Sequence, residues 1–346
     1  MANKYKSGFR IREYLVFAVI TVFTMLLCIC IGSVNIPLCE TADVLLRLLR
    51  GAAQEEGSMA ASIILPVRLP RVLCVAFVGA SLSVGGAAMQ GLLKNPLADG
   101  STLGVSSGAS LGAILAIAFG ITLPGVPFAG TMVMAVLFAF LSLLLILALA
   151  YRLDSSLSTN TIILIGVIFS MFVSSLSNLV ITFAGEKVKT ITFWTMGSLQ
   201  GSSYANAAVM GVTLAVCGLI LLGCATELNA FAVGEENART IGINVRRMKL
   251  TVLICISILI GVSVSIGGSI AFVGLVTPHI LRRITGPNHR RLLPASVFGG
   301  AVFLMLSDLA ARTILRPREL PLGVVTSLIG SVVFVTIFFQ MRKGKL

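Results

Sequence analysis

Leu141-Ser-Leu-Leu-Leu-Ile-Leu-Ala-Leu-Ala150 is a continuous apolar run interrupted by a single serine. It lies inside a longer apolar stretch, 127–151, which as a helix is long enough to cross the roughly 30 Å hydrocarbon core of a bilayer. A transmembrane β-strand would instead alternate apolar and polar residues. The run therefore favours an all-α fold whose helices span a membrane.

The composition of the whole chain agrees with this class. It has 346 residues, of which 57% are hydrophobic, and at roughly 20 residues a span this allows eight to ten spans. Because no polar stretch is long enough to fold alone, we interpret residues 1–346 as a single transmembrane domain. The segments 99–120, which is rich in Gly and Ser, and 270–284, which contains Pro278, are expected to be buried among neighbours. We predict ten spans, at 15–34, 61–93, 99–120, 127–151, 158–184, 206–226, 248–268, 270–284, 294–313 and 321–341.

The net charge of +13 is explained by the predicted topology. The first apolar stretch has the length of a retained span and no small-residue cleavage pattern after it. Ten crossings then place both termini in the cytoplasm, with 17 of the 26 Lys and Arg on that side, as the positive-inside rule expects. No nucleic-acid partner is needed to account for the charge. The nine outward cations would be Arg47, Arg50, Arg68, Arg71, Lys187, Lys189, Arg312, Arg316 and Arg318.

Glycine, cysteine and histidine are interpreted as structural residues. Gly104, Gly108 and Gly112 recur every four residues, which places them on one helical face where another backbone can approach closely. Six of the seven cysteines lie in apolar runs, as small packing residues do. His279 and His289 lack Cys or carboxylate neighbours at a metal-binding spacing, so we predict no metal site and no cofactor bound by this chain.

The main polar segment inside the apolar chain is Gly234-Glu-Glu-Asn-Ala-Arg-Thr-Ile-Gly-Ile-Asn-Val-Arg-Arg-Met-Lys249. We interpret it as one helix with Glu235 and Glu236 at its start and basic residues near its end, which suits the helix macrodipole. The small residues Ala238 and Gly242, four apart, would leave a flat face for docking. A solvated amphipathic connector is an equally open interpretation.

The sequence carries no energy source of its own. It has no Gly-x-x-x-x-Gly-Lys-Ser/Thr phosphate loop, so we do not expect the chain to hydrolyse ATP. Ion-coupled carriers place carboxylates within their spans, whereas Asp99, Asp154, Glu227 and Asp308 lie near the predicted span ends. Energy from a partner that contacts the segment 234–249 is therefore favoured.

Several blocks in order resemble one known family. They are Arg68-Leu-Pro-Arg71, Gly85-Gly-Ala-Ala-Met-Gln90, Asn95-Pro-Leu-Ala98, Leu103-Gly-Val-Ser-Ser-Gly-Ala109, Phe193-Trp-Thr-Met-Gly-Ser198, Gly234-Glu-Glu-Asn-Ala-Arg239, Gly268-Ser-Ile-Ala-Phe-Val-Gly-Leu-Val-Thr-Pro-His279 and Glu319-Leu-Pro-Leu-Gly-Val-Val325. From about residue 60 to 340 the chain resembles the FecCD-type permeases of binding-protein-dependent ABC importers for iron-siderophore, haem and cobalamin.

The resemblance implies a ten-helix bundle like the cobalamin-importer permease, in a bacterial cell membrane. It implies a homodimer, two cytoplasmic ATPase subunits that use ATP and Mg, and an extracytoplasmic binding protein that delivers the cargo. Coupling helices would lie at about 231–247. The residues that match the family's sites are Gly234, Glu235, Glu236, Ala238, Arg239 and Gly242 for ATPase coupling, Arg68, Arg71 and Arg312 for docking of the binding protein, and Thr159 and Asn160 for a cytoplasmic gate.

Alternatives remain open at these sites. The docking arginines would form a cationic rim, to which charge alone adds Arg316 and Arg318. Docking is favoured for Arg68, Arg71 and Arg312, and the alternatives are snorkelling to lipid headgroups and an i,i+4 pair of Arg312 with Asp308. Thr159 and Asn160 could equally belong to the polar cap of a helix start.

The cargo is the least determined feature of the sequence. We expect a ferric siderophore, the family's commonest cargo, with haem or cobalamin as alternatives. An ion-coupled secondary carrier and a membrane scaffold without transport are the rival classes.

Overall fold

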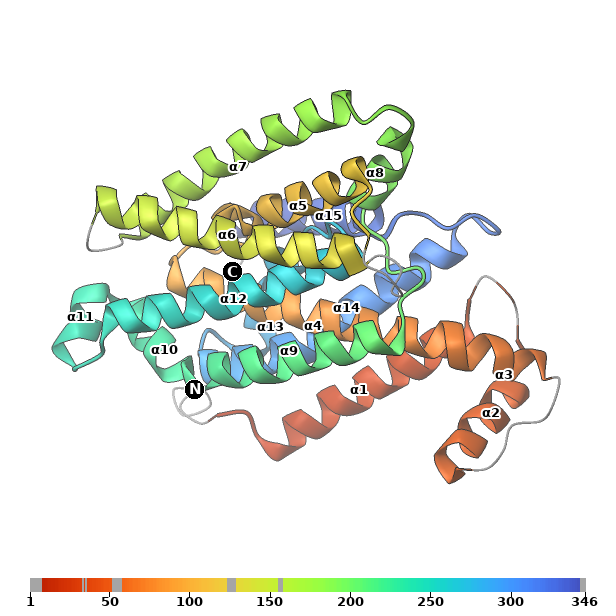
Figure 1. The fold of residues 1–346 in the computed structure, drawn as a ribbon. Coiled ribbons are helices and arrows are strands. Elements are labelled where there is room, and N and C mark those ends of the chain that lie inside the picture. The colour runs from red at the N-terminus through yellow and green to blue at the C-terminus, as the bar shows by residue number, and fades with distance from the viewer. Residues whose placement is uncertain are drawn as a thin grey trace.

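The computed structural model describes residues 8–32, 34, 36–51, 58–122, 129–154 and 158–342. Within these ranges the chain forms helices and no strands, which confirms the all-α class (Figure 1). The predicted cytoplasmic lysines Lys4, Lys6, Lys343 and Lys345 lie outside the described residues.

In the described part of the chain, seven helices are long and apolar enough to cross a membrane. They are α1 (Ile11–Cys30), the continuous stretch Met59–Leu92, α6 (Ala129–Leu153), α7 (Thr159–Thr182), α9 (Tyr204–Gly223), α12 (Val245–Gly267) and α14 (His289–Thr313). The stretch Met59–Leu92 consists of α3 (Met59–Ile63), a π-helical turn (Ile64–Arg68) and α4 (Leu69–Leu92).

Three further helices occupy the remaining predicted spans. They are α5 (Val105–Phe119), preceded by a 3₁₀ turn (Gly100–Leu103), α13 (Val273–Thr285) and α15 (Leu322–Arg342). Each of the ten predicted segments therefore contains a helix, although α5 and α13 are shorter than the expected 99–120 and 270–284. Outside these segments lie α2 (Leu38–Arg50), a 3₁₀ turn (Gly185–Lys187), α8 (Val188–Thr195), α10 (Ala225–Val233) and α11 (Glu235–Thr240).

Helix α4 is the centre of the bundle, because most of its residues are buried and it packs against α9, α12, α13 and α14. Glycine permits these contacts. A Cβ on Gly79 would lie 2.3 Å from the carbonyl oxygen of Gly300 in α14, and one on Gly86 would lie 2.0 Å from that of Gly274 in α13. Main chains thus touch directly, as in small-residue membrane packing.

The predicted glycine face belongs to the contact between α5 and α6. A Cβ on Gly108 would lie 1.8 Å from Ser142 Oγ, and one on Gly112 would lie 2.3 Å from the carbonyl oxygen of Met134. Gly104 differs, because it is the N-cap of α5 with φ +75 and lies against Phe169 of α7. Two of the three glycines therefore face α6, whereas the third also provides a left-handed turn.

Pro278 in α13 has no N–H, which leaves the carbonyl of Gly274 without its usual helical donor. Gln90 of α4, 3% exposed, supplies the missing donor, with its Nε2 3.3 Å from Gly274 O and 3.2 Å from Leu275 O. Its Oε1 accepts from Arg282 at 3.0 Å. One buried amide therefore completes the backbone of the interrupted helix.

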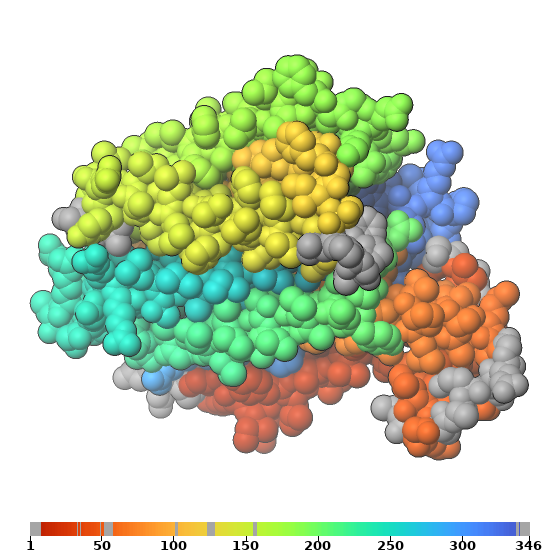
Figure 2. Space-filling model, viewed as in Figure 1, coloured from red at the N-terminus to blue at the C-terminus, as the bar shows by residue number. Residues whose placement is uncertain are grey.

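Figure 2 shows one long face of the molecule, with α7 and α1 at opposite edges and α6, α12 and α9 between them. Many large apolar side chains of α1, α6, α7 and α9 are exposed in the isolated chain. Such an apolar perimeter is what a bilayer or a second membrane subunit covers.

Candidate functional site

Two polar regions lie at opposite ends of the helical bundle (Figure 1). One is at the start of α4 and the end of α14. The other consists of α10, α11 and the start of α12, beyond the opposite end of α4. Helices that run the length of the bundle join the two regions.

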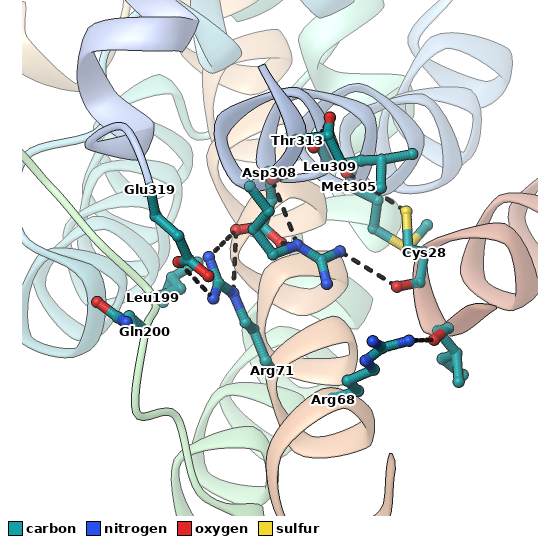
Figure 3. Close-up of polar contacts among 12 residues, drawn as sticks. Cys28, Arg68, Arg71, Leu199, Gln200, Met305, Asp308, Leu309, Thr313 and Glu319 are labelled. Carbon is teal, nitrogen blue, oxygen red and sulfur yellow. Dashed lines mark hydrogen bonds and ion pairs between the residues drawn. The ribbon is translucent and has the colours of Figure 1, made fainter. Parts of the chain in front are cut away.

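The first region is a buried ionic cluster, shown in Figure 3. Arg71 of α4 donates to Asp308 of α14 at 2.8 Å and to Glu319, in the connection to α15, at 2.8 Å. Arg312 lies one turn after Asp308 and donates to its other carboxylate oxygen at 2.9 Å. Asp308 is 1% exposed, so the pairs are shielded from water. Buried ions of this kind need complete pairing, which these contacts provide.

Arg312 of the cluster and the neighbouring Arg68 also close the end of α1. Arg68 Nη1 lies 2.8 Å from the carbonyl oxygen of Ile29 and 3.0 Å from that of Cys30, and Arg312 Nη2 lies 3.2 Å from that of Cys28. The last carbonyls of a helix have no partner within the helix and carry the negative end of its dipole. The guanidinium groups donate hydrogen bonds to these carbonyls and bring positive charge to the negative end of the helix dipole.

The expected exposed rim is therefore wrong for Arg68, Arg71 and Arg312, which are 4%, 7% and 3% exposed. Their partners, Asp308, Glu319 and the end of α1, draw the side chains inward. The alternative i,i+4 pair of Arg312 with Asp308 is confirmed. Arg316 and Arg318 are exposed. Docking of a binding protein stays a prediction.

The second region corrects the prediction of one helix over 234–249. Helix α11 ends at Thr240, and Gly242 follows with φ +87. The N–H of Gly242 donates to Arg239 O and that of Ile243 to Ala238 O, both at 3.0 Å, which is a Schellman motif. Helix α12 then starts anew at Val245, so the basic residues of the segment occupy its first two turns rather than the end of α11.

The small residues of this segment also differ from the expected docking face. Ala238 is 0% exposed and packs inward. A Cβ on Gly242, by contrast, would meet nothing within 4 Å, so this glycine is needed for its backbone conformation. Glu235 accepts from Lys249 of α12 at 3.0 Å and from Arg239 at 3.1 Å. Glu236 is exposed.

Thr159 and Asn160 form the start of α7, as predicted from the sequence. The cap itself is Ser158, whose Oγ accepts from the N–H of Thr161 at 3.4 Å, and Asp154 accepts from the N–H of Ser158 at 3.1 Å. The capping interpretation holds for this turn, and the gate role of Thr159 and Asn160 stays a prediction.

Sequence reasoning missed a pocket of about 520 Å³ between the end of α8, the segment 268–272 and the start of α15. Its lining contains the hydroxyls of Thr195, Ser269, Ser327 and Ser331, with no charged side chain. The block Gly-Ser-Ile-Ala-Phe at 268–272, which lines part of this pocket, was the feature of the sequence that could have indicated it.

Glycines bring the walls of this pocket together. A Cβ on Gly197, at the end of α8, would lie 2.4 Å from Ser269 O, and one on Gly323 of α15 would lie 2.5 Å from the same atom. Phe272 stands at the start of α13 with φ +68, which bulky residues rarely adopt. Three chain segments therefore meet main chain to main chain at the pocket.

No group of three or more His, Cys, Asp or Glu side chains that could hold a metal ion occurs within the described ranges. His289, which was considered from the sequence as a metal ligand, contacts Asn229 through its ring, with Nδ1 of His289 2.9 Å from Oδ1 of Asn229.

Comparison with known proteins identifies the architecture. The model of the FecCD transport family matches residues 20–340. The ABC transporter permease YvrB of Bacillus subtilis, itself uncharacterized, is 40% identical over 93% of this chain and 91% of its own length. The cobalamin import permease BtuC of Halobacterium salinarum is 37% identical over 78% of this chain and 71% of its own length.

A solved structure extends the match to three dimensions. It is described as an inward-facing conformation of a metal-chelate type ABC transporter, and it superposes with a TM-score of 0.83 and 30% identity over 95% of this chain and 99% of that one. The helical bundle, its polar ends and the match over nearly the whole sequence lead to one conclusion: this chain is a multi-pass membrane protein that belongs to the FecCD transport family.

Proposed function

We propose that this chain forms the translocation path of an ABC importer for a ferric siderophore that an extracytoplasmic binding protein delivers. FecCD permeases are translocation subunits without catalytic activity, and separate ATPase subunits hydrolyse the ATP. In this proposal the chain itself binds no cofactor, and ATP and Mg act on the ATPase. The observation that carries the proposal is the family match over residues 20–340.

The proposed assembly contains two copies of this chain, two ATPase subunits and one binding protein. The ATPases would contact the α10–α11 end. The start of α1 and the end of α15, and so both termini, would then be on the cytoplasmic side, and the ionic cluster would be outside. The apolar side chains exposed on α7, such as Met171 at 67% and Phe172 at 65%, support burial against lipid or a second copy. Thr159 and Asn160 would narrow the path at the cytoplasmic end.

At the outer end, an acidic binding protein would meet the exposed Arg316 and Arg318 first. Arg71 lies deeper, but its partner Glu319 has a side chain 18% exposed. A carboxylate from the binding protein could replace Glu319 without leaving Arg71 unpaired. Docking at Arg71 therefore requires an exchange of partners, whereas Arg316 and Arg318 would steer the approach.

The hydroxyl lining of the pocket supports a cargo in which the metal ion is enclosed by an organic ligand, that is, a chelate. Related permeases carry names that refer to cobalamin, molybdate, Fe(3+)-citrate and hemin. A bare oxyanion would meet no charged side chain in this pocket, whereas a chelate can make weak hydrogen bonds to Ser327 or Ser331 and still leave. Among chelates, the ferric siderophore is favoured because it is the family's commonest cargo.

The test is uptake by proteoliposomes that contain this chain, its ATPase and its binding protein. Equal amounts of a ferric siderophore, hemin, cobalamin and molybdate are offered with and without ATP. We expect ATP-dependent uptake of the ferric siderophore. ATP-driven uptake of another cargo alone would correct the substrate, and uptake that follows an imposed proton or sodium gradient without ATP would favour a secondary carrier.

A further inference from the structure

A buried lysine joins the polar segment to the membrane helices. Lys249 lies in the second turn of α12 and is 1% exposed. Its Nζ lies 3.0 Å from both carboxylate oxygens of Glu235, the first residue of α11. The pair crosses the turn at Gly242, so it connects two helices that the backbone alone would leave free to hinge.

The same ammonium also faces α10. Lys249 Nζ lies 5.5 Å from the centre of the Phe231 ring, which is 0% exposed. Lys94, just after α4, places its Nζ 4.9 Å from the same ring. Both distances fall within the range of cation–π attraction, which is strengthened where the ring is shielded from water.

These successive side-chain contacts connect the central helix to the polar segment, in the order α4, Lys94, Phe231, Lys249 and Glu235. A buried cation keeps its position because breaking its ion pair, here with Glu235, has a large cost. A displacement of α11 therefore carries Lys249, and with it the start of α12, which packs against α4 and α6.

A second pair in the same place provides the contrast. Arg239 of α11 donates to Glu235 Oε1 at 3.1 Å, but its side chain is 57% exposed. Exposed pairs are worth little because solvent screens them and the free side chains gain entropy. Arg239 also lies on the same short helix as Glu235, so that pair joins nothing across the turn.

We propose that Lys249 is the positioning residue that transmits the movement of α11 to α12, through its buried contacts with Glu235 and Phe231. This inference rests on the proposed function, in which an ATPase moves α11. It assigns to one side chain the conversion of ATP hydrolysis into movement of the spans.

The first test measures ATP hydrolysis and uptake in the same proteoliposomes, with the complete transporter. Lys249→Met should lower the amount of cargo imported per ATP by about tenfold, in the range of an allosteric coupling, while hydrolysis continues. Arg152→Met is the control, because it removes an exposed cation at the end of α6, outside the segment 234–249, and should leave the ratio unchanged. The double variant Glu235→Lys with Lys249→Glu should restore part of the ratio.

A second measurement needs no transport and separates failure of this inference from failure of the proposed function. Spin labels are attached at Thr240→Cys in α11 and Ile258→Cys in α12, both exposed positions, in a permease whose native cysteines are replaced. Lys249→Met should broaden the distance distribution between the labels, and Arg239→Met should not. An unbroadened distribution in a folded, monodisperse Lys249→Met protein would overturn the inference, as would an unchanged ratio of uptake to hydrolysis.

Discussion

At the scale of single residues, Arg71 is the main contact of the ionic cluster. Arg71→Met would remove one of the two arginines that pair with Asp308, which is 1% exposed, and would deprive Glu319 of its ion pair. Removing one partner of a buried pair costs about 3–5 kcal/mol, so we expect a loss of stability of that order. Thermal unfolding of the purified permease in detergent measures it.

Arg318→Met is the control for this prediction. Its side chain is exposed on the connection to α15, and exposed substitutions usually change stability by less than about 0.5 kcal/mol. If both variants unfolded at the wild-type temperature, Arg71 would not hold the cluster together.

Sequence reasoning at this scale identified the arginines but not their environment. The i,i+4 spacing of Asp308 and Arg312 predicted their pair. The partners Ile29 and Glu319 lie far along the chain from Arg68 and Arg71, and no local pattern records that distance. The sequence therefore identified the charged residues correctly but did not predict that they are buried.

At the scale of helical elements, the approach of α5 to α6 depends on Gly112. A Cβ there would lie 2.3 Å from a backbone carbonyl, which cannot move aside as a flexible side chain can. Gly112→Ala should therefore destabilise the protein by about 1–3 kcal/mol through overpacking. A Cβ on Gly218 of α9 would lie 3.6 Å from the nearest atom, Cδ1 of Leu214, which is an ordinary contact. Gly218→Ala should therefore leave the unfolding temperature unchanged or slightly raised. Equal effects would contradict the predicted close contact.

The end of α11 gives a second prediction of this kind. Gly242 has φ +87, and a left-handed conformation costs other residues about 1–2 kcal/mol. Gly242→Ala should weaken the turn and make the segment 241–244 more susceptible to limited proteolysis, while the stability of the bundle is kept. Gly223→Ala, at the end of α9 with no neighbouring atom within 4 Å, is the control. Wild-type proteolysis of the Gly242 variant would show that the turn does not depend on glycine.

The elements were predicted with uneven success, for a physical reason. Long apolar runs such as 127–151 identify their helices because the bilayer imposes both length and composition. The bilayer imposes no such pattern on the polar segment 234–249, and Gly242, with its positive φ, divides this segment into two helices. Helix α2 packs against its sequence neighbours α1 and α3, and it was missed because its charged residues interrupt the apolar pattern of a span. The pocket beside segment 268–272 depends on contacts between distant parts of the chain, which the sequence alone did not indicate.

At the scale of the whole molecule, two cysteines outside the spans report the orientation. Cys39 is exposed on α2, at the end that we place outside, and Cys224 lies between α9 and α10, at the end that we place in the cytoplasm. A membrane-impermeant maleimide applied to sealed right-side-out vesicles should label a variant that retains Cys39 alone. A variant that retains Cys224 alone should react only after the vesicles are opened.

The pH dependence of this reaction provides a further check. Burial, and next the charge of Glu227, raise the pKa of the Cys224 thiol. The reactive thiolate is therefore scarce at neutral pH, and labelling in opened vesicles should accelerate as the pH rises above about 8. Labelling of Cys224 in sealed right-side-out vesicles would reverse the proposed orientation.

In the proposed importer this chain provides a passage, whereas the energy comes from an ATPase that contacts the α10–α11 end. The decisive experiment uses vesicles that contain the purified permease alone, with the ferric siderophore outside and an imposed proton or sodium gradient. We predict no accumulation of the siderophore until ATPase, binding protein and ATP are all added. Accumulation by the permease alone would show that this division of roles is wrong.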